Sequence, residues 1–176
     1  RDCRDVICSM RNLQVSENNS WLKKWGIPIV NYWIEKLQEF RSEFGSDIKL
    51  VKDSKNYDLA IASLYWKYKN ASFFKYEQLK YPIIKIKYED LVNNPKQTIE
   101  SICTFLNIDW DDSLMVHHKH DHVETDSNGL TVGMTNVKNQ ISKQRVGIYK
   151  TELTKEEESD ILKISGDLLM KMGYVI

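Results

Sequence analysis

Residues 1–9 have the sequence RDCRDVICS, and this short stretch carries the strongest indication of fold and function. Ser9 follows Arg1 by eight positions, and the apolar residues between them predict a helix over residues 6–13. A guanidinium offers a planar fork of donors to phosphate oxygens, and a serine hydroxyl at a helix start adds a directed hydrogen bond. Where a strand turns into a helix, Arg1 and Ser9 can therefore converge on one anion. The alternative is a solvated arginine and an incidental helix serine.

This stretch resembles the 3′-phosphate-binding motif of sulfotransferases that depend on 3′-phosphoadenosine 5′-phosphosulfate (PAPS). That motif is commonly Arg-(Asp/Asn)-Pro-(Arg/Lys)-Asp-Val-x-x-Ser, and the chain matches it in register except for Cys3 in place of proline. A second stretch, YEDL at residues 88–91 with Asn94-Pro95 after it, resembles the segment whose tyrosine contacts the adenine region in this family. The resemblance implies that role for Tyr88, and a buried tyrosine at a strand end is the alternative.

A third stretch, VGIYKTELT at residues 146–154, resembles the family's Gly-x-Trp-Lys-x-x-(Leu/Phe)-Thr segment, with Tyr149 in place of tryptophan. In cytosolic members an Arg-Lys-Gly triplet just before this segment reaches the 3′-phosphate. Lys143 and Arg145 are the nearest cations in this chain. The resemblance implies that these two residues and Gly147 line the cofactor site, whereas solvated surface charges are the alternative for the two cations.

The resemblance implies an α/β fold, the P-loop-kinase-like sulfotransferase fold, with a helix-rich carboxyl-terminal portion and few parallel strands. Residues 1–176 are expected to be one sulfotransferase-like domain that begins as a fragment at Arg1, without the amino-terminal half and its phosphosulfate-binding loop. The catalytic residues are expected in that half. The segment alone is therefore predicted to be inactive, and the missing half has to come from the same chain or from a second chain.

The implied reaction transfers a sulfuryl group from PAPS to an unknown hydroxyl or amine acceptor, and this chain supplies the 3′-phosphate and adenine-side contacts. Two alternatives stay open: a non-catalytic module that binds adenosine 3′,5′-bisphosphate (PAP), and a helical interaction module without a ligand. Lys plus Arg and Asp plus Glu both number 25, which gives a formal net charge of zero. That balance disfavours nucleic acid as a partner.

Hydrophobic periodicity predicts one long helix over residues 21–44, which Pro28 kinks or resets and which ends at Gly45. A second helix is predicted over residues 58–74, and the β-branched run at residues 81–88 predicts a strand.

Further along the chain, Asn94-Pro95 predicts the start of a helix, and the polar residues 109–139 predict a loop. Thr154 and Glu157 predict a capping box at the start of a last helix, which Gly173 closes.

The three cysteines form no CxxC pair and are interpreted as buried free thiols of a reducing compartment. The sequence has no apolar run long enough for a membrane span and no visible signal peptide, so a cytoplasmic location is expected. Glycosylation sequons at Asn18 and Asn70 leave the Golgi lumen as the alternative. All four histidines lie in residues 117–122, but no second type of ligand stands at a standard spacing, so no metal is expected.

Overall fold

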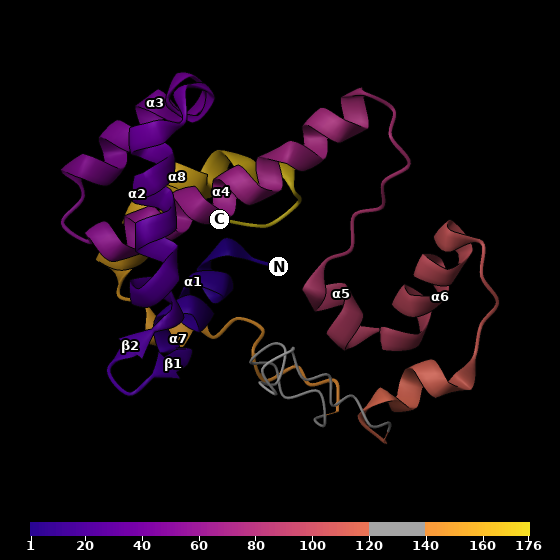
Figure 1. The fold of residues 1–176 in the computed structure, drawn as a ribbon. Helices are drawn as coiled ribbons and strands as arrows, with labels where there is room; N and C mark the ends of the chain where they lie inside the picture. Colours follow the sequence, from indigo (N-terminus) through magenta and orange to yellow (C-terminus); the bar gives the residue numbers. More distant parts are fainter. Residues whose placement is uncertain (120–139) are drawn as a thin grey trace, which may run out of the picture. The chain divides into compact units, whose positions relative to one another are not determined.

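The computed structural model describes residues 1–119 and 140–176, which form two compact units (Figure 1). The first unit contains Arg1–Ile83 and Gly147–Ile176, and the second contains Ile84–Val146. The elements of the first unit are α1 (Cys3–Asn12), β1 (Gln14–Ser16), β2 (Asn19–Ser20), the π-helix η1 (Leu22–Gly26), α2 (Ile27–Lys36), α3 (Gln38–Asp53), α4 (Tyr57–Gln78), α7 (Tyr149–Glu152) and α8 (Lys155–Lys171). Those of the second unit are α5 (Tyr88–Asn93), α6 (Pro95–Leu106) and the 3-10 helix η2 (Asp112–Lys119).

Helix α4 is the element around which the first unit is built. Residues 59–64 are all buried, as expected of a helix that other helices surround. Helices α1, α2, α3 and α8 all pack against it. Each Leu or Ile buried in this way contributes about 1.5–3 kcal/mol, so these helix contacts are the main source of stability in the unit.

The structure is rich in helix, as predicted, but its strands differ from the prediction. The described residues contain one sheet, the antiparallel hairpin of β1 and β2, and no parallel strands. The strand predicted over residues 81–88 is wrong, because residues 81–87 are neither helix nor strand and Tyr88 begins α5. A β-branched run becomes a strand only beside another strand, and the hairpin is the only sheet within residues 1–119 and 140–176.

The single helix predicted over residues 21–44 is also wrong, because the structure divides this region. Helix α2 ends before Leu37, whose φ of −99° and ψ of 107° leave the helical region, and α3 then begins. Burial explains the break, since it allows Val30 of α2 and Phe40 of α3 to join one apolar cluster with Ile61 of α4.

Two local signals in this region coincide with irregularities of the helices. Pro28 lies in the first turn of α2, directly after the π-helix η1, so the helical pattern changes at this proline. The backbone leaves the helical region at Phe44, whose φ is −113° and ψ is 23°, next to the predicted helix end at Gly45. The helix resumes and continues to Asp53, so the position of Gly45 marks an interruption within α3 and not its end.

Other local signals are confirmed. Helix α6 begins at Pro95, α4 occupies the predicted region and extends beyond it, and α1 begins three residues before the predicted start and ends one residue before the predicted end. The Thr154 hydroxyl accepts the Glu157 N–H at 3.2 Å while the Glu157 carboxylate accepts the Thr154 N–H at 2.8 Å, which is the predicted capping box. Gly173 follows α8 with φ 83°. In the predicted loop, residues 112–119 form η2, and residues 120–139 lie outside the described residues.

Cys3, Cys8 and Cys103 are free and buried, which confirms that part of the prediction for the thiols, while the reducing compartment stays a prediction. Among the helices that the structure describes, none combines the length and the apolar character needed to cross a membrane.

Candidate anion-binding site

The motif at residues 1–9 opens helix α1. Asp2 is the N-cap residue, and its Oδ1 accepts the backbone N–H of Arg4 at 2.9 Å. Cys3 is consequently the first helical residue, where proline is tolerated because the N–H has no helical partner. Asp2 has φ −49° and ψ 130°, and this ψ lies in the range that a residue before proline adopts. Cys3 therefore stands at a helix position that also accepts proline.

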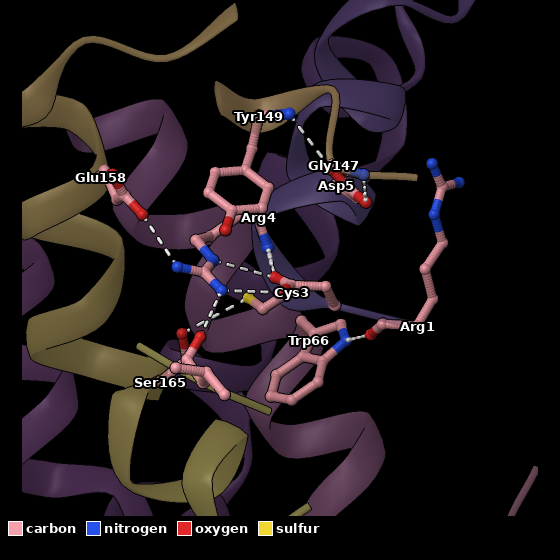
Figure 2. A network of polar contacts seen from close by, with 11 residues as sticks. Arg1, Cys3, Arg4, Asp5, Trp66, Gly147, Tyr149, Glu158 and Ser165 are labelled. Atoms are coloured by element: carbon pink, nitrogen blue, oxygen red, sulfur yellow. Dashed lines mark hydrogen bonds and ion pairs between the residues drawn. The ribbon is translucent and has the colours of Figure 1, made fainter. Parts of the chain in front are cut away.

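The side chains of Arg1, before the helix, and of Ser9, within it, come together. Arg1 Nη1 donates to Ser9 Oγ at 3.2 Å, and both residues are half-buried. The backbone of Arg1 is also held, because its carbonyl oxygen accepts the indole N–H of Trp66 at 3.2 Å. Figure 2 shows the Arg1 side chain extending away from the polar network around Arg4. A guanidinium and a hydroxyl fixed side by side form a pair of donors suited to one anion.

Arg4, by contrast, is used inside the protein. Its side chain is 4% exposed, and it binds the Asp2 carboxylate through Nε at 3.1 Å and Nη2 at 2.8 Å. Nη1 donates to Glu158 Oε1 and Nη2 to the Val175 carbonyl, both at 2.8 Å. Burial by itself lowers the pKa of Arg4, but the hydrogen bonds and charge of Asp2, together with Glu158, raise it above its ordinary value. Arg4 thus ties α1 to α8 and to the carboxyl-terminal residues.

Asp5 connects α1 to the turn that precedes α7. It is 1% exposed, its Oδ2 accepts the Gly147 N–H at 2.7 Å, and its Oδ1 accepts the Tyr149 N–H at 3.1 Å (Figure 2). Gly147 has φ 75°, a conformation that favours glycine. The amide N–H of Gly147, one of the predicted cofactor residues, is already bound to Asp5. The contribution of Gly147 is therefore the bend that its backbone makes in this turn.

Cys3 lies in a buried polar junction between three helices. Ser165 of α8 donates to Cys3 Sγ at 3.4 Å, and the Ser63 hydroxyl of α4 lies 4.0 Å from the same sulfur. Burial raises the pKa of the Cys3 thiol to about 12. The thiol is neutral near pH 7 and serves as a packing residue.

The remaining predicted residues lie in the second unit. The Tyr88 hydroxyl donates to the Ser142 carbonyl at 3.3 Å, which brings Tyr88 to the residue next to Lys143. The Lys143 carbonyl accepts the Val146 N–H at 2.9 Å, and the side chains of Lys143 and Arg145 are exposed. Tyr88 is thus close to the segment of the two cations within its own unit. The contacts of these three residues with a nucleotide stay predictions.

Sequence reasoning missed the residues that hold the site in place. Trp66 fixes the Arg1 backbone from 65 positions away, and Glu158 binds Arg4 from 154 positions away. No local pattern marks either residue, because each role depends on packing between distant helices. Asp5 lies inside the recognised motif, but its partners at 147 and 149 are not visible in the sequence.

The histidine cluster is only partly described. His117 and His118 lie in η2 with their rings edge to face, 5.5 Å apart, and the other two histidines lie outside the described residues. Within residues 1–119 and 140–176, no group of three or more His, Cys, Asp or Glu side chains is arranged to hold a metal ion.

Comparison with known proteins adds a family match. Residues 34–112 match the model of the sulfotransferase family. This range runs from the end of α2 to the start of η2 and includes the YEDL stretch, whereas residues 1–9 and 146–154 lie outside it. The match confirms the resemblance to sulfotransferases. No curated protein sequence and no solved structure matches the chain.

Proposed function

We propose that this chain, whose residues 34–112 match the sulfotransferase family, holds the 3′-phosphate and adenine side of PAPS during sulfuryl transfer to a hydroxyl or amine. The observation that carries the proposal is the Arg1 Nη1–Ser9 Oγ contact of 3.2 Å. Arg1 supplies the positive charge and a fork of donors, and Ser9 supplies a hydroxyl donor. The P-loop-kinase-like fold of the complete catalytic domain is part of the same proposal.

The different environments of the motif residues support this assignment. Asp2, Arg4 and Asp5 are all at most 7% exposed and are bound to each other or to distant elements. Arg1, which precedes α1, and Ser9, in the second half of α1, are half-buried. A phosphate ligand needs side chains that are preoriented and still reachable from solvent, and the Arg1–Ser9 pair meets both conditions.

In the proposed mechanism the chain acts by positioning. Sulfuryl transfer is an in-line displacement that depends mainly on alignment and on stabilisation of the developing charge. Anchoring the 3′-phosphate at Arg1 and Ser9 fixes the nucleotide, so that its phosphosulfate end is directed to the acceptor. Tyr88, Lys143 and Arg145 are proposed as further contacts to the nucleotide. Since the resemblance assigns the phosphosulfate loop to residues before the motif, residues 1–176 alone are expected to bind PAP without turnover.

Calorimetry with PAP and the full-length protein tests the proposal. Arg1→Ala is expected to weaken PAP binding at least about tenfold, because it removes a charge-assisted contact, and Ser9→Ala is expected to weaken it less. Adenosine 5′-monophosphate, which lacks the 3′-phosphate, is expected to bind both variants like the unmodified protein. Arg11→Ala is the matched control, because Arg11 lies on the same helix but pairs with Glu157 at 3.0 Å.

Two outcomes contradict the proposal. If PAP does not bind the full-length protein, or if Arg1→Ala binds PAP unchanged, the helical interaction module is favoured. If PAP binds but the full-length protein transfers no label from radioactive PAPS to a panel of acceptors, the non-catalytic PAP-binding module is favoured.

A further inference from the structure

Asp5 lies on the same side of α1 as Ser9, one of the two proposed phosphate ligands. It precedes Ser9 by four positions within the helix, and side chains four positions apart are neighbours on a helix surface. Arg1 precedes α1, and its side chain reaches Ser9 through the hydrogen bond of 3.2 Å. A carboxylate at this place is unexpected next to an anion site, because like charges repel.

The contacts of Asp5 explain why a carboxylate is present. Both of its oxygens are used, one by the Gly147 N–H at 2.7 Å and the other by the Tyr149 N–H at 3.1 Å. The side chain is almost fully buried, so these bonds replace water and hold the turn at 147–149 against α1. Arg4 makes a second contact between α1 and this turn, because its guanidinium carbon lies 4.0 Å from the centre of the Tyr149 ring.

We infer that Asp5 is a positioning residue for 3′-phosphate binding, an inference that rests on the proposed function. Asp5 does not touch the phosphate. It fixes the turn at 147–149 on the face of α1 that carries Ser9, and this turn forms one side of the phosphate site. Loss of the two Asp5 hydrogen bonds releases the turn and weakens binding of the 3′-phosphate, even though a negative charge is removed at the same time.

The variant Asp5→Asn separates positioning from charge. Asparagine has the same shape, but its side chain offers one acceptor oxygen and one NH2 group, so it cannot accept both backbone N–H groups. The binding of PAP and of adenosine 5′-monophosphate is measured by calorimetry with the full-length protein. PAP binding is expected to weaken at least about tenfold, while binding of the monophosphate changes less than about twofold.

Gly147→Ala disturbs the same turn without changing Asp5. Alanine at φ 75° is strained, while the added Cβ meets no atom within 4 Å, so the change acts through the backbone. This variant is expected to lower the preference for PAP over the monophosphate in the same way. In the double variant, the preference for PAP over the monophosphate is expected to fall no further than in the stronger single variant, because both substitutions act on one turn. Should Asp5→Asn fail to fold, Gly147→Ala carries the same test.

Asp160→Asn is the matched control for a loss of stability alone. Asp160 is another buried carboxylate of the first unit, and it binds Lys163, Ser54 and Asn56 instead of the turn. It is expected to lower stability and to leave the ratio of PAP to monophosphate affinity unchanged.

The results separate failure of this inference from failure of the proposed function. If the unmodified protein does not bind PAP, both are overturned. If it binds PAP through Arg1 but Asp5→Asn leaves the affinity ratio unchanged or increases it, only the positioning role of Asp5 is overturned.

Discussion

The guanidinium carbon of Arg4 lies 4.0 Å from the centre of the Tyr149 ring, although 145 positions separate the two residues. The ring face attracts the cation, while Asp2 and Glu158 bind the nitrogen atoms of the same guanidinium. Burial raises the pKa of the Tyr149 hydroxyl, and the Arg4 charge partly opposes this effect. The Tyr149 ring therefore provides an aromatic face for the buried arginine.

Removing the Arg4 side chain is expected to destabilise the first unit strongly. In Arg4→Ala the buried Asp2 carboxylate loses its cation, and breaking such a pair costs about 3–5 kcal/mol. Urea denaturation followed by circular dichroism measures this free energy of unfolding. Lys49→Ala removes an exposed cation on α3 and is expected to change the value by less than about 0.5 kcal/mol. Equal effects of the two substitutions would show that the Arg4 network adds nothing to stability.

Proline is expected to be tolerated at position 3 and rejected at position 8. Cys3 and Cys8 are both fully buried, but Cys3 is the first residue of α1 while Cys8 is in its interior. Cys3→Pro changes packing and is expected to lower the free energy of unfolding by about 1–2 kcal/mol. Cys8→Pro also breaks the helix, which lowers the free energy of unfolding by about 3 kcal/mol more. Thermal unfolding monitored by circular dichroism compares the two variants, and a less stable Cys3→Pro protein would contradict the assigned helix start.

The thiols of Cys3 and Cys8 are expected to resist modification in the folded protein. Burial raises the pKa of each thiol to about 12, and the Glu152 carboxylate adds to the effect at Cys8. Only the thiolate reacts, and at pH 8 its population is very small for both residues. Labelling with iodoacetamide at pH 8, followed by peptide mass spectrometry, is expected to modify both residues only in urea. Rapid labelling of Cys3 without urea means that the start of α1 opens.

Asp160 is expected to make stability depend on pH in the acidic range. The Lys163 ammonium, at 2.7 Å, is the main cause that holds the pKa of Asp160 below its ordinary value, and Asn56 and Ser54 contribute. Because the pKa is lower in the folded state, the stabilisation is complete above the unfolded pKa of about 3.9. It is lost as the pH falls through the folded pKa.

Urea denaturation between pH 7 and pH 2 compares the unmodified protein with Asp160→Asn. The unmodified protein is expected to be the more stable one at pH 7, and the difference is expected to shrink below about pH 4. Glu17→Gln, on the exposed hairpin between β1 and β2, is the control and is expected to leave the profile unchanged. A difference that stays constant down to pH 2 would contradict the role of the Asp160 charge.

Local signals in the sequence determined where several elements begin and end. Pro95, the Thr154–Glu157 capping box and Gly173 act within one helical turn, so neighbouring residues are sufficient to specify them. The sequence also determined that Arg1 and Ser9 are candidates for one site, because an arginine before a helix and a serine on its first turns can converge on one anion.

Only the tertiary structure decided what the other motif residues do. Asp5 binds the turn at 147–149, and the division of the predicted helix at Leu37 follows from burial of α2 and α3 against α4. The strand predicted at 81–88 failed for the same reason, since a strand needs a partner that its own residues cannot supply. Contacts between distant segments depend on the packing of whole helices, and no single stretch of sequence contains that information.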